Sequence, residues 1–204
     1  MIPNSPASFF IGKFPHNWHA EILAARPLIL PTRHFVYPAQ AEEVERGALE
    51  VLVRPGALDS STPSREFLAT CALGFRDPAM PTGLWSCPNP DEICAVSGGY
   101  AYMISANNPE CFTMISYRPV MDVRVALEEN LLLFVGHHSI IAWGAEGQAW
   151  QSEKLSSEGL TVEEVSGPVL HGMGWDLMTD KEIPFALDLM TGLTISTAPP
   201  SFFR

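Results

Sequence analysis

Basic residues are scarce in this sequence of 204 residues, which has 12 lysines and arginines against 23 aspartates and glutamates. The formal net charge of −11 repels the phosphate backbone of nucleic acids, whose nonspecific binding depends on protein cations. It also repels anionic membrane surfaces, so we expect neither a nucleic-acid nor a membrane partner. The charge would attract a basic protein or a cationic ligand, but solubility is the simpler explanation of it.

Long apolar runs are missing as well. The longest, Leu131–Val135, has about five residues, whereas a membrane-spanning helix needs about 20. Residues 1–14 contain one lysine, two prolines and no continuous apolar core, so they lack the pattern of a signal peptide. We therefore expect a cytoplasmic protein without a membrane span.

Cysteine is too sparse for a disulfide scaffold in a chain of this length, because only Cys71, Cys87, Cys94 and Cys111 are present. No two of them have the Cys-x-x-Cys spacing. Cys87 and Cys94 are separated by six residues, which is wider than the gap of about two to four that is usual at zinc sites. We expect free thiols, a reducing compartment and no metal site here.

Motifs of known catalytic chemistry are also absent. The sequence has no Gly-x-Ser-x-Gly elbow, no His-Glu-x-x-His and no Gly-x-x-x-x-Gly-Lys-Ser/Thr phosphate loop. Asp176, Asp180 and Glu182 form an acidic stretch, but without the spacing of a calcium loop, so we interpret it as a solvated hairpin. No metal and no cofactor is expected.

Proline and glycine, by contrast, are plentiful and evenly spread, with 18 and 15 copies that divide the chain into short segments. The 47% hydrophobic content predicts a folded chain, and the length predicts one domain, residues 1–204. Gln40–Arg46 is the best helical candidate and Asp59–Arg65 the best candidate for a mobile loop. The predicted strands are Ala48–Arg54, Phe67–Phe75, Ile93–Val96, Tyr100–Ile104, Cys111–Ser116, Val120–Leu127, Leu131–Val135, Ser139–Trp143, Gln148–Leu155, Leu160–Val165, Val169–Met173, Ile183–Leu187 and Leu193–Thr197. This density of short strands predicts a mostly β fold with little helix, a propeller-like stack or a β-sandwich of antiparallel meanders.

Residues 92–196 use one pattern three times, namely strand, turn, strand, turn and strand. The three degenerate units are Glu92–Met114, Leu131–Leu155 and Gly167–Ser196. Their second strands recur at intervals of about 40 residues, which is the period of propeller blades.

The sequences IIAWGAEGQAW and PFALDLMTGLTIS, within residues 131–196, resemble the blades of quinoprotein-type or WD-repeat-type β-propellers. The quinoprotein pattern runs Ala-x-Asp-x-x-x-Gly-x-x-x-Trp. Ala186, Asp188 and Gly192 match it, Ser196 stands in place of its tryptophan, and Trp150 supplies the tryptophan in the other copy. The resemblance implies that this tryptophan docks between neighbouring blades; it implies no quinone cofactor. Three units are too few to close a ring.

A candidate binding surface follows from the first turns of the three units, Ser97–Gly99, Gly136–His138 and Gly172–Asp176. If the units are stacked copies, these turns lie along one edge, where binding residues tend to collect. His137, His138, Trp175 and Asp176 are therefore the candidate ligand-binding residues, and we expect no shared metal because neighbouring strand residues point to opposite faces.

We interpret the chain as a non-catalytic binding or protein-interaction module for an unknown protein or small molecule, because a β scaffold is present without a catalytic motif. A small hydrolase or isomerase with acid and base residues on separate loops stays open as an alternative. So does an acidic inhibitor or immunity-type protein that covers a basic partner.

The cysteine pattern gives a first testable prediction. Alkylation in denaturant without reductant should add one label to each of the four cysteines, because none is expected to be paired. Mass spectrometry measures the labels. A native Cys87–Cys94 disulfide would contradict both the free thiols and the reducing compartment.

Overall fold

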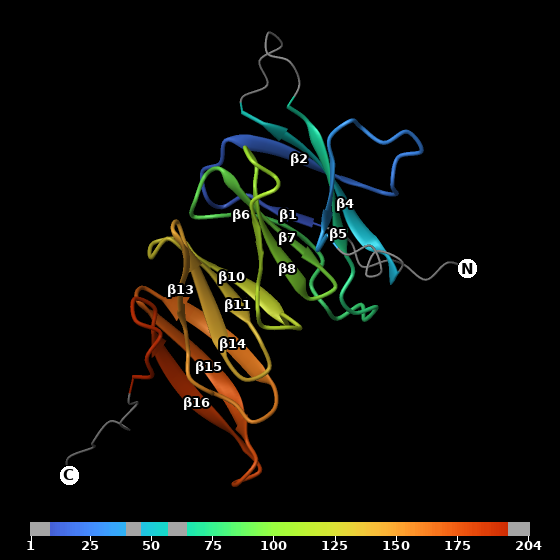
Figure 1. Cartoon of the computed structure of the whole chain (residues 1–204). Helices are drawn as coiled ribbons and strands as arrows, with labels where there is room; N and C mark the ends of the chain where they lie inside the picture. Colours follow the sequence, from blue (N-terminus) through green and yellow to red (C-terminus); the bar gives the residue numbers. More distant parts are fainter. Residues whose placement is uncertain (1–8, 40–45, 57–64, 196–204) are drawn as a thin grey trace, which may run out of the picture. The chain divides into compact units, whose positions relative to one another are not determined.

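The structure is a computed structural model that describes residues 9–39, 46–56 and 65–195. Within these residues the fold is nearly all β, with strands in four small sheets and no α-helix, which confirms the predicted fold class. The chain divides into two compact units, Met1–Asp122 and Val123–Arg204, which are described in turn (Figure 1). Residues 40–45 of the predicted helix and 59–64 of the predicted loop lie outside the described residues. The expectation of a single domain stays a prediction.

Unit 1 contains two sheets. The first has the strand order β1-β6-β7-β8-β9 and the second the order β2-β4-β5-β3. Most neighbours are antiparallel, but β1 pairs with β6 and β3 with β5 in parallel. The strands are β1 (Phe9–Ile11), β2 (Trp18–Leu23), β3 (His34–Tyr37), β4 (Ala48–Pro55), β5 (Phe67–Ala72), β6 (Gly83–Ser86), β7 (Glu92–Ser97), β8 (Tyr100–Ser105) and β9 (Phe112–Met114).

Side-chain alternation places the core of unit 1 between its two sheets. Val51 of β4 and Ala69 of β5 lie in one buried cluster with Ile93 of β7 and Tyr102 of β8. Residues that alternate with these core residues along β4 and β5, such as Glu50 next to Val51, therefore face the other side of the second sheet. All four cysteines belong to this unit as free thiols; Cys71, Cys87 and Cys94 are buried and Cys111 is exposed.

Unit 2 also consists of two sheets with a core between them. One has the order β10-β11-β12-β13 and the other β14-β15-β16. Leu133 and Ala142 from the first sheet pack in one cluster with Leu170 and Leu187 from the second. The strands are β10 (Asp122–Ala126), β11 (Leu131–Val135), β12 (Ile140–Gly144), β13 (Gly147–Gln151), β14 (Leu160–Ser166), β15 (Val169–Asp176) and β16 (Lys181–Asp188). No helix among the described residues is long and apolar enough to cross a bilayer.

Two of the three predicted meanders are present as expected, β7-β8-β9 and β11-β12-β13. The third begins one strand earlier than predicted, at Leu160, and comprises β14-β15-β16. The predicted turn Gly172–Asp176 is therefore wrong, since these residues belong to β15. Gly174 serves close packing instead of a turn, because a Cβ atom there would overlap the carbonyl oxygen of Leu155. The predicted last strand is reduced, within the described residues, to a single bridge between Thr194 and Leu187.

An indole joins the two sheets of unit 2. Trp150 of β13 donates its Nε1 hydrogen to the carbonyl oxygen of Leu189, 2.7 Å away, in the turn that follows β16. The ring rests against Gly192, where an added Cβ atom would lie 2.6 Å from indole atoms. Asp188 holds this turn by accepting hydrogen bonds from the amides of Met190 and Thr191.

Substitution of Gly192 tests how much this contact contributes. Gly192→Ala combines a positive φ of 71° with overlap against the indole. Gly159→Ala is the matched control, because its φ is 79° and nothing lies within 4 Å of the added Cβ. We expect the control to lower the free energy of unfolding by about 1 kcal/mol and Gly192→Ala by about 1–3 kcal/mol more. Urea unfolding measures both, and equal losses would contradict the docking contact.

Candidate functional site

The predicted histidines lie in the turn between β11 and β12. Their ring centroids are 6.1 Å apart; His137 is half-buried and His138 is exposed. The carbonyl oxygen of His138 accepts a hydrogen bond from the amide of Leu155 at 2.7 Å. Two residues later, the amide of Ser157 donates to the carbonyl oxygen of Trp175, also at 2.7 Å. The structure thus brings the main chains of His138 and Trp175 to the same short segment.

The side chain of Trp175 points away from that segment. Gly174 faces Leu155 so closely that it has no room for a Cβ atom, and successive strand residues project to opposite faces. The half-buried indole of Trp175 therefore leaves β15 on the other face of its sheet. A ligand that touches both His138 and Trp175 has to reach around the end of β15, and the shared site stays a prediction.

Asp176 closes the turn from β15 to β16. Its carboxylate accepts hydrogen bonds from the hydroxyl of Thr179 at 2.6 Å and from the Thr179 amide at 3.1 Å. The hydroxyl hydrogen bond and the turn amides lower the pKa of Asp176, because they stabilise the ionised form. This arrangement gives Asp176 a role in the turn itself.

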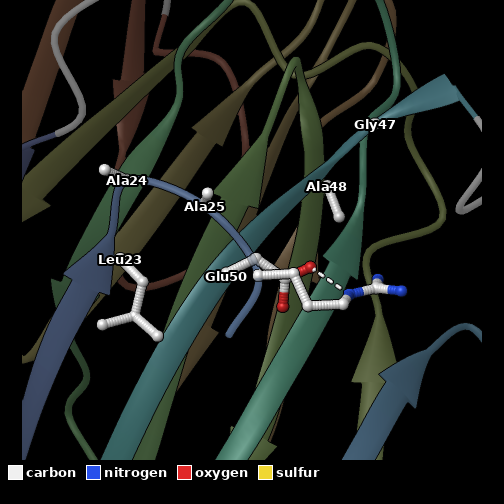
Figure 2. Close-up of a pocket in the computed structure, with 7 residues that line it drawn as sticks. Leu23, Ala24, Ala25, Gly47, Ala48 and Glu50 are labelled. Carbon is white, nitrogen blue, oxygen red and sulfur yellow. Dashed lines mark hydrogen bonds and ion pairs between the residues drawn. The ribbon is translucent and has the colours of Figure 1, made fainter. Parts of the chain in front are cut away.

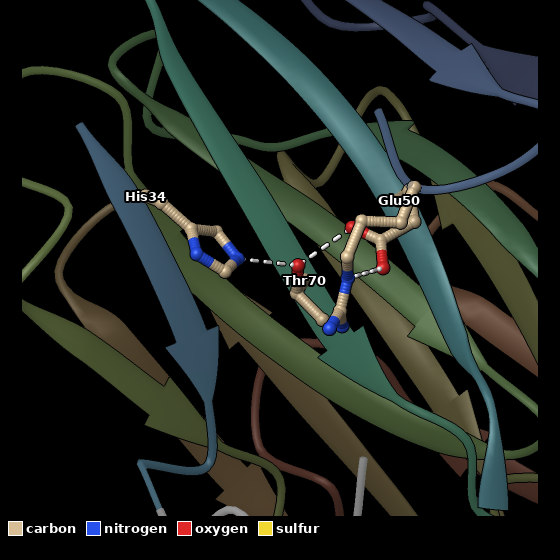
Figure 3. Close-up of polar contacts among 4 residues, drawn as sticks. His34, Glu50 and Thr70 are labelled. Carbon is tan, nitrogen blue, oxygen red and sulfur yellow. Dashed lines mark hydrogen bonds and ion pairs between the residues drawn. The ribbon is translucent and has the colours of Figure 1, made fainter. Parts of the chain in front are cut away.

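A polar cluster that the sequence analysis missed lies on the outer face of the second sheet of unit 1. Glu50 of β4 is paired in register with Thr70 of β5, and the two residues are 6% and 0% exposed. The Thr70 hydroxyl donates to Glu50 Oε2 at 2.6 Å, and Arg26 Nε donates to Glu50 Oε1 at 2.8 Å. His34 Nε2 lies 2.8 Å from the Thr70 hydroxyl oxygen (Figure 3).

The hydrogen bonds of this cluster run in one direction. Thr70 has a single hydroxyl hydrogen, which it donates to Glu50, so His34 must donate its Nε2 hydrogen to Thr70. The buried carboxylate of Glu50 thereby receives one donor from the sheet and one from Arg26. Burying a carboxylate is costly unless it is hydrogen-bonded and paired, so the cluster holds Arg26, three residues after the end of β2.

A shallow pocket of about 330 Å³ opens beside this ion pair. Figure 2 shows Leu23 on β2, and Ala48 and Glu50 on β4, along it. Its lining residues are Leu23, Ala24, Ala25, Arg26, Gly47, Ala48 and Glu50. In the part of the chain that the structure describes, Arg26 makes no hydrogen bond through its two Nη nitrogens. The pocket therefore combines short apolar side chains with a guanidinium whose two Nη nitrogens bind none of the described residues.

The cluster is unsuited to nucleophilic catalysis. The Thr70 side chain is fully buried, and its hydroxyl hydrogen is engaged by Glu50 and not by a base. A nucleophile has to reach the substrate and give its proton to a base. Glu50, Thr70 and His34 order Arg26 instead.

A polar residue inside an apolar strand was the signal that the sequence offered for this site. Glu50 interrupts the apolar run of β4, and Thr70 does the same in β5. Their proximity depends on the register of the two strands, and His34 reaches Thr70 only through the parallel pairing of β3 with β5. No local sequence pattern predicts the register of β4 and β5 or the parallel pairing of β3 with β5.

No protein-family model and no curated protein sequence matches this chain. Among the described residues, no three His, Cys, Asp or Glu side chains gather as they would around a metal ion. An assignment of function to this chain therefore depends on the contacts of its own residues.

Loss of the Thr70 hydroxyl tests the buried cluster. Thr70→Val keeps the shape of the side chain but removes one donor from the buried carboxylate of Glu50, so we expect the free energy of unfolding to fall by about 1–3 kcal/mol. Thr113→Val, at an exposed position of β9, is the control and should change it by less than about 0.5 kcal/mol. Urea unfolding measures both variants. Similar values for the two would show that Glu50 does not need this hydrogen bond.

Proposed function

We propose that the chain is a non-catalytic binding module and that its ligand site is the pocket beside Arg26 and Glu50. One observation carries the proposal: a guanidinium that lines the pocket is held through its Nε by a buried carboxylate, and its Nη donors have no partner among the described residues. Small-molecule sites typically combine apolar walls with a few fixed polar groups, in volumes upward of about 300 Å³. The pocket is at the small end of that range.

The chemistry of the pocket favours a short aliphatic carboxylate. A guanidinium presents its planar donors to the two oxygens of a carboxylate, and it does so best when its own orientation is fixed. Leu23, Ala24 and Ala48 offer contact surface for only a few methylene groups. Because Glu50 already neutralises Arg26, we expect modest affinity.

A small hydrolase is the alternative, since a histidine, a hydroxyl and a carboxylate lie in one cluster. The burial of Thr70 argues against it, because a nucleophile has to reach its substrate. A second binding surface at the end of unit 2, with His137, His138, Trp175 and Asp176, stays a proposal, supported by the main-chain contacts of His138 and Trp175 with one segment. We also infer a reducing, cytoplasmic setting, which the free thiols support.

Propionate is a suitable probe for the pocket, with 1-propylamine as the cation of similar size. In a two-dimensional NMR titration, propionate should shift the amide resonances of Gly47 and Ala48 with a Kd of about 1 mM or weaker, and propylamine should not. Arg26→Ala should raise the Kd at least about tenfold, since hydrogen bonds to charged groups contribute about 1.5–3 kcal/mol.

Arg54→Ala is the matched control for this titration, because Arg54 forms an ion pair with Glu66 in the same unit and does not line the pocket. Its Kd should equal that of the native chain. The same spectra report whether each variant is folded. Propionate shifts that are absent, or that survive in folded Arg26→Ala, would overturn the proposal.

A further inference from the structure

An apolar loop between β2 and β3 is presented to solvent. Leu28 and Ile29 expose 105% and 89% of their reference surface, and Leu30 exposes 44%. Pro27 and Pro31 flank the three aliphatic residues. Figure 1 shows the loop in blue, projecting from the strands of its own unit. Contiguous exposed aliphatic side chains of this kind mark surfaces that another body covers.

The base of this loop is fixed on both sides. Before it, Arg26 binds the buried carboxylate of Glu50. After it, Arg33 donates from Nη1 to the carbonyl oxygen of Arg65 at 2.5 Å. The Arg33 guanidinium carbon also lies 5.8 Å from the ring centroids of Phe35 and Phe67. The prolines restrict the backbone further, so the loop is held as a defined apolar tip.

The charge around the tip differs in sign from that of the whole chain. Residues 22–41 contain two arginines and one histidine but no aspartate or glutamate. Within residues 9–39, 46–56 and 65–195, neither Arg33 nor Arg65 has a carboxylate partner, whereas Arg26 and Arg54 do. The Arg33 guanidinium therefore lies against the main chain of Arg65 at the base of the tip, and neither arginine is paired with a carboxylate of the described residues.

We propose that this loop docks on the surface of an anionic lipid bilayer. Leu28 and Ile29 enter the boundary between headgroups and acyl chains, and Arg33 and Arg65 lie at the level of the anionic headgroups. Aliphatic insertion combined with basic flanking charge is the general mode of interfacial attachment. The net charge argues against membranes only for the chain as a whole, because charges more than about 8 Å apart are largely screened at physiological salt.

A bilayer fits the tip better than a protein partner does. A stable protein interface covers about 800 Å² on each side, with about 20 residues or more, whereas this tip offers three side chains on a convex loop. Interfacial attachment to lipid needs only a few apolar groups and nearby cations. The proposal is independent of the pocket, because it needs no carboxylate ligand.

Vesicle co-sedimentation tests the proposal with the full chain. Vesicles of phosphatidylcholine with about 30% phosphatidylserine should bind it, and pure phosphatidylcholine vesicles should bind it less. Leu28→Asp combined with Ile29→Asp should lower the partition coefficient at least about tenfold, because two aliphatic side chains are lost from the interface. Arg33→Gln should lower it about fivefold, the effect of one cation near an anionic surface.

The turn after β15 supplies the matched control, Leu177→Asp combined with Met178→Asp. Leu177 and Met178 are 63% and 92% exposed, but Asp176 and Asp180 flank them. This variant should bind vesicles like the native chain. The proposal would be overturned by absent binding to phosphatidylserine vesicles, by equal losses in both double variants, or by a tip that binds a protein and no vesicles. Loss of propionate binding alone would leave it standing.

Discussion

The alternation of side chains along short strands is the constraint on which both units depend. No described strand has more than eight residues, so one sheet alone covers little apolar surface. Each unit therefore places two sheets face to face, and strands of both sheets contribute alternate residues to the layer between them. The same alternation decides what faces outward. On β4, Leu49 and Val51 enter the core, which leaves Glu50 on the opposite side of the sheet.

A buried carboxylate on that outer face determines the local arrangement of three distant segments. Glu50 needs donors, and it receives them from Thr70 on β5 and from Arg26 after β2, while His34 on β3 supports Thr70. The guanidinium of Arg26 is partly exposed, so solvent screens its side of the pairing with the buried Glu50. The ion pair fixes the position of Arg26, which lines the pocket and directly precedes the apolar loop.

Apolar pattern and turn residues predict the strands correctly where they act locally. Leu131–Val135 matches β11 residue for residue, and both fully predicted meanders consist of antiparallel neighbours. The strands β1, β2, β3 and β6 are not predicted by the sequence pattern. Two of the pairings that these strands make are parallel, and no local turn in the sequence indicates a parallel pairing. Gly174 is predicted to lie in a turn, because the sequence alone does not distinguish a turn glycine from a strand glycine in close packing. The cluster of Glu50 and Thr70 depends on strand register, which hydrophobic pattern leaves unspecified on an outer face.

Two copies of one turn sequence show how a single side chain decides what a β-hairpin can contact. Asp176–Asp180 and Asp188–Gly192 share their first four residue types, and in each the aspartate accepts hydrogen bonds from the two amides that follow its neighbour. The fifth residue has a positive φ in both, 54° at Asp180 and 71° at Gly192. Only the glycine lacks a Cβ atom, so only that turn accepts the indole of Trp150. The acidic copy has a Cβ atom at the position of this glycine, and its Leu177 and Met178 are exposed between Asp176 and Asp180.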